Sequence, residues 1–197
     1  MSLPNPIVLL DARARYVHPA FQMTRASTKT VFDATGKLVT VPANALGWDH
    51  DPATGQARGY LAEPSATNLL LHSNDLTQGV WTTPGATITP DATIGPDGEG
   101  MSKLVESATD TLHNLMQNPL TISDDEVMAV SIVVKAAERS GIIMYWRDGS
   151  ETGLEAQITV DAHNGQITSA SASGGATLIG SGILDLGGGF YRAWLSA

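Results

Sequence analysis

From Trp81 to the last residue, short apolar runs alternate with turn sequences, and this spacing restricts what the chain can fold into. Two of the runs, Val127–Lys135 and Ile142–Arg147, are rich in apolar and β-branched residues and are long enough to form buried strands. Further along, Asn164-Gly165 is a dipeptide favoured in two-residue hairpin turns. Strands about 8 to 12 residues apart, with turns between them, predict an antiparallel β-sandwich or barrel.

The other expected strands follow the same pattern and are bounded by turn residues. They are residues 86–89, ending at Pro90, and residues 103–106, 155–160, 166–169, 176–179, 183–186 and 190–195. Gly187–Gly189 should form a flexible hairpin turn rather than a phosphate-binding loop, because no Lys-Ser/Thr pair or helix follows it. A short helix is expected, if anywhere, at residues 101–104 or 107–116.

The first third of the chain differs from the rest because prolines are concentrated there. They are Pro4, Pro6, Pro19, Pro42, Pro52 and Pro64. Proline at this density excludes long helices and central strands. Two turn sequences, Asp33–Gly36 and Asp51–Gly55, separate short apolar pieces such as Lys37–Val41. We therefore expect residues 1–76 to form an irregular anchor or trimerisation segment with short hairpins, and residues 77–197 to form the sandwich.

The end of the chain carries a further expectation. Leu195-Ser196-Ala197 lies inside or just after the last expected strand. A sandwich that stops in mid-strand lacks a closing edge. We therefore expect either that the natural chain continues or that a partner chain completes the sheet.

The composition excludes several classes of partner and chemistry. Eleven Lys and Arg residues are outnumbered by twenty Asp and Glu residues, for a formal net charge of −9. Binding to nucleic-acid phosphates or to an anionic membrane surface needs clustered cations, so neither is expected. Because there is no cysteine, disulfides, thiol chemistry and cysteine-zinc sites are impossible.

No apolar run approaches the roughly 18 to 20 residues of a membrane span. The N-terminus lacks the features of a signal peptide, so we expect synthesis in the cytoplasm.

Catalytic motifs are missing from the sequence, so we expect a protein that is not an enzyme and needs no cofactor. The five histidines lack HxxxH or HExxH spacing, and no GxSxG nucleophile motif occurs. His50, in the segment Trp48–Pro52, is expected in a structural turn, with a metal site as the alternative. Asp124-Asp125-Glu126 is expected to be a solvated turn, with a structural Ca²⁺ site as the alternative.

Aromatic residues next to arginines are the candidate ligand-binding residues. Strand alternation places Tyr145 and Arg147 on one face of their strand. It likewise places Arg192 and Trp194 together on one face of the last strand. Sugar-binding faces combine an aromatic platform with hydrogen-bonding side chains, because a pyranose ring has an apolar face and polar edges. The alternative is that these aromatic residues line the core or an oligomer interface.

The segment from Phe21 to Trp81 contains a distinctive block of short motifs. It includes D-A-T-G-K-L at 33–38, W-D-H-D-P-A-T-G at 48–55, G-Y-L-A-E at 59–63 and T-N-L-L-L at 67–71. The block resembles the start of phage tail-fibre and head-spike fibre proteins, including the head spikes of gene transfer agents. In that family an arginine usually stands where this chain has Trp48. The residues that carry the resemblance are Arg25, Phe32, Asp33, Gly36, Asp49, Asp51, Pro52, Gly55, Glu63, Thr67 and Asn68.

The resemblance implies a fold, a location and partners. It implies a mainly β protein in which an antiparallel jelly-roll β-sandwich, similar to a carbohydrate-binding module, follows the anchor segment. It also implies a homotrimeric virion subunit that contacts a capsid vertex or tail baseplate and attaches to host surface polysaccharide. The alternative is a purely structural connector or vertex protein without glycan affinity. A depolymerase is disfavoured, because the chain is too short for a long β-helix with paired carboxylates.

Overall fold

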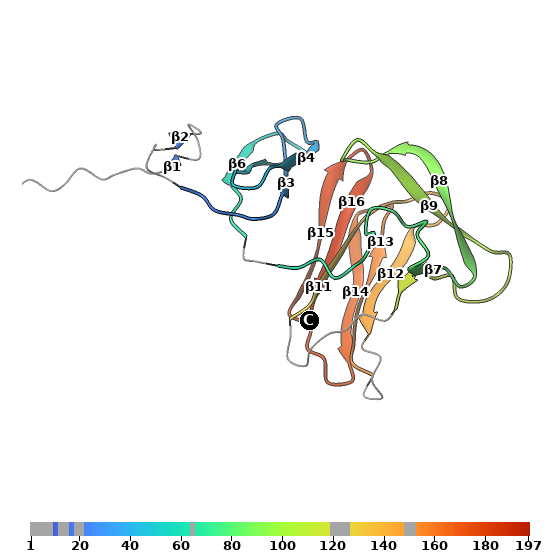
Figure 1. The fold of residues 1–197 in the computed structure, drawn as a ribbon. Helices are drawn as coiled ribbons and strands as arrows, with labels where there is room; N and C mark the ends of the chain where they lie inside the picture. Colours follow the sequence, from blue (N-terminus) through green and yellow to red (C-terminus); the bar gives the residue numbers. More distant parts are fainter. Residues whose placement is uncertain (1–9, 12–15, 18–21, 64–65, 119–126, 148–152) are drawn as a thin grey trace, which may run out of the picture. The chain divides into compact units, whose positions relative to one another are not determined.

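The computed structural model describes residues 10–11, 16–17, 22–63, 66–118, 127–147 and 153–197. Within these residues the chain is mainly β, every strand pair is antiparallel and there is no helix (Figure 1). No helix in this part of the chain is long and apolar enough to cross a membrane. The chain divides into two compact units, one comprising Met1–Ser65 with Pro96–Gly98 and the other Ala66–Gly95 with Glu99–Ala197.

The described residues of the first unit form three two-stranded sheets. They pair β1 (Leu10–Asp11) with β2 (Tyr16–Val17), β3 (Lys29–Phe32) with β4 (Leu38–Val41), and β5 (Trp48–His50) with β6 (Ala57–Tyr60). The β3–β4 and β5–β6 hairpins are the short hairpins that the turn sequences predict. The buried apolar side chains of these two hairpins are Val31, Phe32 and Pro52, so the described residues of this unit form only a small core.

In the part of the second unit that the structure describes there are two hairpin-like pairs and two three-stranded sheets. The pairs are β7 (Trp81–Thr82) with β10 (Met116–Gln117) and β8 (Ala86–Ile94) with β9 (Gly100–Glu106). One sheet has the order β11 (Ala129–Lys135), β16 (Phe190–Ser196), β15 (Gly180–Gly187). The other has the order β12 (Gly141–Arg147), β13 (Glu155–Asp161), β14 (Gln166–Ser173).

The two three-stranded sheets share one hydrophobic core. Along the central strand β13, alternate residues are buried, as expected for a strand with one face against a core. Ala156, Ile158 and Val160 of β13 cluster with Ala193 and Leu195 of β16. The inner faces of the two sheets therefore face each other, and their outer faces point away from the core.

Most strands expected from the sequence are present, and the mainly β class is confirmed. Two details are wrong. The strand at 86–89 does not end at Pro90 but continues to Ile94, with Pro90 opposite Ser102. Among the described strands, β8 pairs only with β9. A proline whose nitrogen points to the unpaired side of β8 therefore removes no hydrogen bond from the ladder. The strand expected at 176–179 is an irregular connection, because β14 runs on to Ser173 before the chain crosses to the other sheet.

The two helix expectations are also wrong. Residues 101–104 belong to β9, and residues 107–115 are irregular before β10 begins at Met116. Pairing of β9 with β8 across a tight turn outweighs the weak helix propensity of a short segment.

The last strand does not have the open edge that the sequence suggested. β16 is the central strand of its sheet and is hydrogen-bonded to β11 on one side and β15 on the other. The backbone of Ala197 exchanges hydrogen bonds with that of Met128, which extends the ladder by one pair. The edges of this sheet are β11 and β15, which precede β16 in the chain.

Candidate attachment and binding surfaces

The turns of the β3–β4 and β5–β6 hairpins are each closed by an aspartate side chain. Oδ1 of Asp33 accepts hydrogen bonds from the Thr35 hydroxyl at 2.5 Å, the Thr35 amide at 2.8 Å and the Lys37 amide at 3.1 Å. Oδ1 of Asp51 accepts from the amides of Ala53 and Thr54 at 3.0 and 2.9 Å. Short polar side chains that cap nearby amides stabilise such turns.

These hydrogen bonds lower the pKa of both aspartates, because each bond favours the charged carboxylate. The bond from the Thr35 hydroxyl is the largest cause of the lowered pKa of Asp33. For Asp51 the largest cause of the lowered pKa is the Thr54 amide, with a further contribution from Arg58. Nη2 of Arg58 lies 2.7 Å from Oδ2 of Asp51.

The two turns pack against each other, and the contact is made at their glycines. Gly36 has a φ of 80° and its Cα approaches the Pro52 carbonyl, so a Cβ atom there would lie under 3.0 Å from that oxygen. Gly55 has a φ of 69°, and a Cβ atom on it would lie 2.5 Å from the Ala34 carbonyl oxygen. Each turn therefore needs glycine both for its backbone conformation and for the close approach of the other turn. We call this arrangement of 33–36 and 51–55 the turn clasp.

A second link between the hairpins joins β3 to β5 through side chains. Oδ1 of the buried Asp49 accepts the Phe32 amide at 2.9 Å, and Nδ1 of the buried His50 lies 2.8 Å from the Phe32 carbonyl oxygen. The backbone N–H and C=O of Phe32 thus both have side-chain partners on β5, as buried polar groups require. His50 therefore lies in a buried strand rather than in the expected turn, which begins at Asp51.

Arg25 ties the segment before β3 to the loop after β4. Its guanidinium donates to the carbonyl oxygens of Ser27 at 2.8 Å, Pro42 at 2.5 Å and Ala45 at 3.0 Å. The Arg25 amide also donates to Oδ1 of Asn44 at 2.9 Å. Only arginine presents several donors in a rigid fork that can reach this many acceptors at once.

Glu63 forms an ion pair with a lysine that the sequence did not single out. The Lys29 side chain is only 8% exposed, and its Nζ lies 2.7 Å from Oε2 of Glu63 and 2.6 Å from the Leu61 carbonyl oxygen. The same ammonium lies 5.7 Å from the centre of the Tyr60 ring. Burial of a lysine requires such partners. A lone Lys in the strand sequence K-T-V-F carries no signal that would have predicted this role.

The remaining block residues, Thr67 and Asn68, belong to the second unit and are exposed. Oδ1 of Asn68 accepts the Leu70 amide at 3.1 Å, and its Nδ2 donates to the Ser73 hydroxyl at 3.0 Å. The Gln117 side chain then pairs with both polar groups of Leu71, at 2.8 and 2.9 Å. The backbone here is fixed to β10, while the Leu71 side chain remains 59% exposed.

The four candidate ligand-binding residues do not converge. Tyr145 and Arg147 lie on the outer face of β12, and Arg192 and Trp194 lie on the outer face of β16. Because the inner faces of the two sheets share a core, the two pairs point away from each other. Nε of Arg147 donates to Oε2 of Glu155 at 2.7 Å, and its Nη2 reaches the same oxygen, so this guanidinium already has a carboxylate partner.

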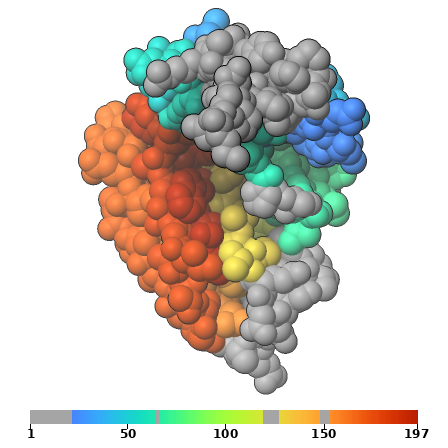
Figure 2. All heavy atoms as spheres, turned by 90° about the vertical axis from the view of Figure 1, so that its left-hand side faces the viewer, coloured from blue at the N-terminus to red at the C-terminus, as the bar shows by residue number. Residues whose placement is uncertain are grey.

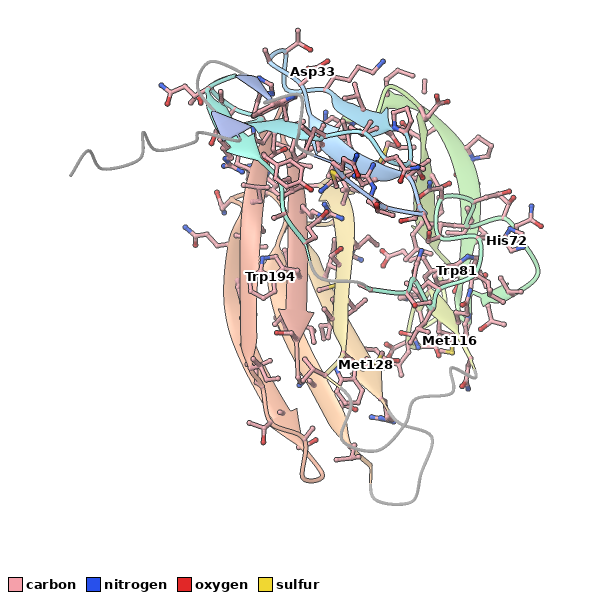
Figure 3. The ribbon with its side chains drawn as sticks, turned by 60° about the vertical axis from the view of Figure 1, so that its left-hand side comes forward. Asp33, His72, Trp81, Met116, Met128 and Trp194 are labelled. Atoms are coloured by element: carbon pink, nitrogen blue, oxygen red, sulfur yellow. The ribbon has the colours of Figure 1, made fainter. Side chains whose placement is uncertain are left out.

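Trp194 lies across two glycines of the neighbouring strand. A Cβ atom on Gly182 would lie 2.5 Å from Nε1 of Trp194, and one on Gly180 would lie 3.4 Å from the far edge of its six-membered ring. Figure 3 shows Trp194 in front of the sheet, with β12–β14 behind it. The sequence contains the glycines, but only the register of β15 against β16 reveals that the indole covers them.

Among the described residues there is no group of three or more His, Asp or Glu side chains that could hold a metal ion. The candidate Ca²⁺ site at Asp124-Asp125-Glu126 lies outside the described residues. No protein-family model, curated protein or solved structure matches this chain.

Proposed function

We propose that this chain is a structural, non-enzymatic subunit of a phage-like virion, a spike or fibre protein. Residues 1–76 contain the anchor, which attaches to other virion proteins at a capsid vertex or tail baseplate. The following β-rich part is a jelly-roll sandwich similar to a carbohydrate-binding module, and it presents a surface to host polysaccharide. The assembly is a homotrimer, formed in the host cytoplasm and carried on the virion.

The observation that carries the proposal is what the side chains of the 21–81 motif block contact. Asp33, Asp51 and Arg25 are engaged with nearby backbone groups, and Gly36 and Gly55 interlock the turns. A catalytic group would need to be held towards a substrate. Side chains that instead hydrogen-bond to nearby backbone groups are consistent with a rigid attachment module, whose outer surface would contact other virion proteins.

The size of the first unit is a second, independent support. In the part of that unit that the structure describes, the buried apolar side chains are Val31, Phe32 and Pro52, which form a small core. A unit of this kind gains stability by packing against partner proteins or against copies of itself. Attachment to a particle and trimerisation both supply that contact.

The first test is the composition of purified particles. Peptides of this chain should be found by mass spectrometry in particles purified on a density gradient, and gold-labelled antibody should mark a vertex or the tail. Light scattering after size-exclusion chromatography should give three times the chain mass. A chain that stays out of particles, or a stable monomer at high concentration, would contradict the proposal.

A purely structural connector is the second candidate. It is favoured by the separation of Tyr145 and Arg147 from Arg192 and Trp194, since four residues on two opposite faces do not form one pocket. Binding of intact particles to a glycan array separates the two candidates. Binding supports an attachment protein, and its absence supports a connector.

A further inference from the structure

The outer face of the sheet β11–β16–β15 carries a flat aromatic surface. The Trp194 indole reaches from Gly182 to Gly180, which are two residues apart on β15. A ring system in contact with both glycines must lie along the strand rather than stand upright from the sheet. The residue is 40% exposed, so the ring face that is turned away from the glycines is open to solvent. In Figure 2 the red atoms of the β15–β16 region lie beside the yellow atoms of β11.

Polar and cationic side chains border this surface. Ser131 of β11 is the direct partner of Trp194 across the ladder and is exposed. Arg192 is two residues along β16, on the same face and also exposed. Lys135 lies further along this face, with its ammonium 4.5 Å from the centre of the Phe190 ring.

The outward positions of this sheet have a charge opposite to that of the whole chain. Strand alternation makes the outward residues Ala129, Ser131, Val133, Lys135, Phe190, Arg192, Trp194, Ser196, Gly180, Gly182, Leu184 and Gly187. Among them Phe190 is buried, with the Lys135 ammonium over its ring. Two of these described residues, Lys135 and Arg192, are cations and none is a carboxylate, whereas the chain has a formal net charge of −9. The Asp91 carboxylate interacts electrostatically with Lys135, so Arg192 is the cation on which the site depends. A local cationic strip of this kind selects an anionic group that the rest of the surface repels.

We propose that this face binds an acidic polysaccharide through a carboxylated pyranose, with Trp194 as the stacking platform and Arg192 as the carboxylate-binding group. The apolar face of a pyranose ring packs on the open face of the indole. The guanidinium offers paired N–H donors to the sugar carboxylate, and Ser131 offers a hydroxyl to the ring edge. This inference rests on the proposed attachment function and names the class of sugar and the face that takes it.

The opposite outer face is not part of this site. Arg147 is held by Glu155, so a sugar carboxylate would have to displace an existing partner. The cation nearest to Tyr145 along β12 is therefore Arg147, and Arg147 already has a carboxylate partner. The two faces supply matched test and control variants within one chain.

The experiment measures binding of the full chain to defined oligosaccharides by calorimetry. The probes are hexamers of galacturonate and mannuronate and a hexasaccharide of hyaluronan, with maltohexaose and cellohexaose as neutral comparisons. At least one acidic probe should bind, and Arg192→Gln should weaken it about tenfold. Trp194→Ala should abolish measurable binding, whereas Tyr145→Ala and Arg147→Gln should leave it unchanged.

The glycines supply a test that keeps the tryptophan. In Gly182→Ala the new Cβ, 2.5 Å from Nε1, would push the indole off the strand and weaken binding. In Gly180→Ala the separation of 3.4 Å is nearly ordinary contact, so binding should change much less. Circular dichroism and thermal unfolding of each variant separate loss of the platform from loss of the fold.

The outcomes distinguish this inference from the proposed function. If no acidic probe binds, or if Arg192→Gln and Trp194→Ala bind as well as the unaltered chain, this face is not the sugar site. Tryptophan would then only shield bare glycine backbone. If neutral probes bind as tightly as acidic ones, the role given to Arg192 is wrong. If acidic probes bind but the chain is missing from particles, the virion role fails while the sugar site stands.

Discussion

Gly36 lies against the carbonyl oxygen of Pro52, so closely that a Cβ atom in its place would be under 3.0 Å from that oxygen. The relationship is reciprocal, because Gly55 approaches the carbonyl of Ala34 in the same way. Two hairpins with similar turn sequences thus hold each other through their backbones. The clasp explains why two aspartate-to-glycine turns occur in one small unit: each one needs the other to pack against.

Replacing Gly36 by alanine should open the clasp. The positive φ alone costs an L-residue about 1 to 3 kcal/mol, and the clash with the Pro52 carbonyl adds to it. Hydrogen exchange of the segments containing β3 to β6 should speed up, while exchange in the β11–β16 sheet should not. Gly79→Ala is the matched control, since no atom lies within 4 Å of its Cβ position and its φ is not positive. Equal protection of β3 to β6 in both variants would contradict the clasp.

Acid should weaken the same turns. The pKa values of Asp33 and Asp51 are lowered in the folded chain, so each contributes stability at pH values above its unfolded pKa of about 3.9. That contribution is lost as the pH falls through the folded pKa. Carboxyl NMR titration should therefore give midpoints below the ordinary value for both residues. Changing Thr35 to Val should move the Asp33 midpoint upward and leave the Asp51 midpoint in place.

Arg25 should not be replaceable by lysine. A lysine keeps the charge but loses the rigid fork that reaches the Ser27, Pro42 and Ala45 carbonyls. Hydrogen bonds from charged groups contribute about 1.5 to 3 kcal/mol, so a loss of that order is expected for the first unit. Urea unfolding followed by hydrogen exchange measures it. Arg58→Lys is the control, because that side chain is more exposed and its ion pair with Asp51 survives the change. Equal effects of the two substitutions would argue against the role of Arg25.

The core of the second unit should be sensitive at Leu195 and tolerant on its outer face. Leu195 is fully buried between the sheets, so Leu195→Ala should cost about 2 to 5 kcal/mol in the free energy of unfolding. Ile143 is 61% exposed, and Ile143→Ala should cost under about 0.5 kcal/mol. Thermal unfolding of both variants tests this difference. A large loss at Ile143 would show that the outer face of β12 is covered by another surface.

Local patterns account for most of the strand positions. Alternation and turn residues predicted β11 to β13, and the Asn164-Gly165 turn predicted the return strand β14. The connection itself differs from the expected two-residue turn. It comprises the four residues 162–165, in which Gly165 adopts a positive φ of 63° and Asn164 does not. The strand at 176–179 and the two helices were wrong, because those segments are shaped by connections between sheets and by long-range pairing that no local window contains.

The candidate sites divide in the same way. By itself, the sequence determined that this is a β-rich, cysteine-free, acidic chain, that aspartate and glycine form its turns, and that Arg192 and Trp194 share a face of their strand. Only the tertiary structure decided that the two turns interlock, that Lys29 is buried beside Glu63, and that Tyr145 and Trp194 lie on opposite outer faces. The physical reason is that periodicity and turn chemistry act over a few residues. Close backbone approach and strand register instead join positions that are far apart in the chain.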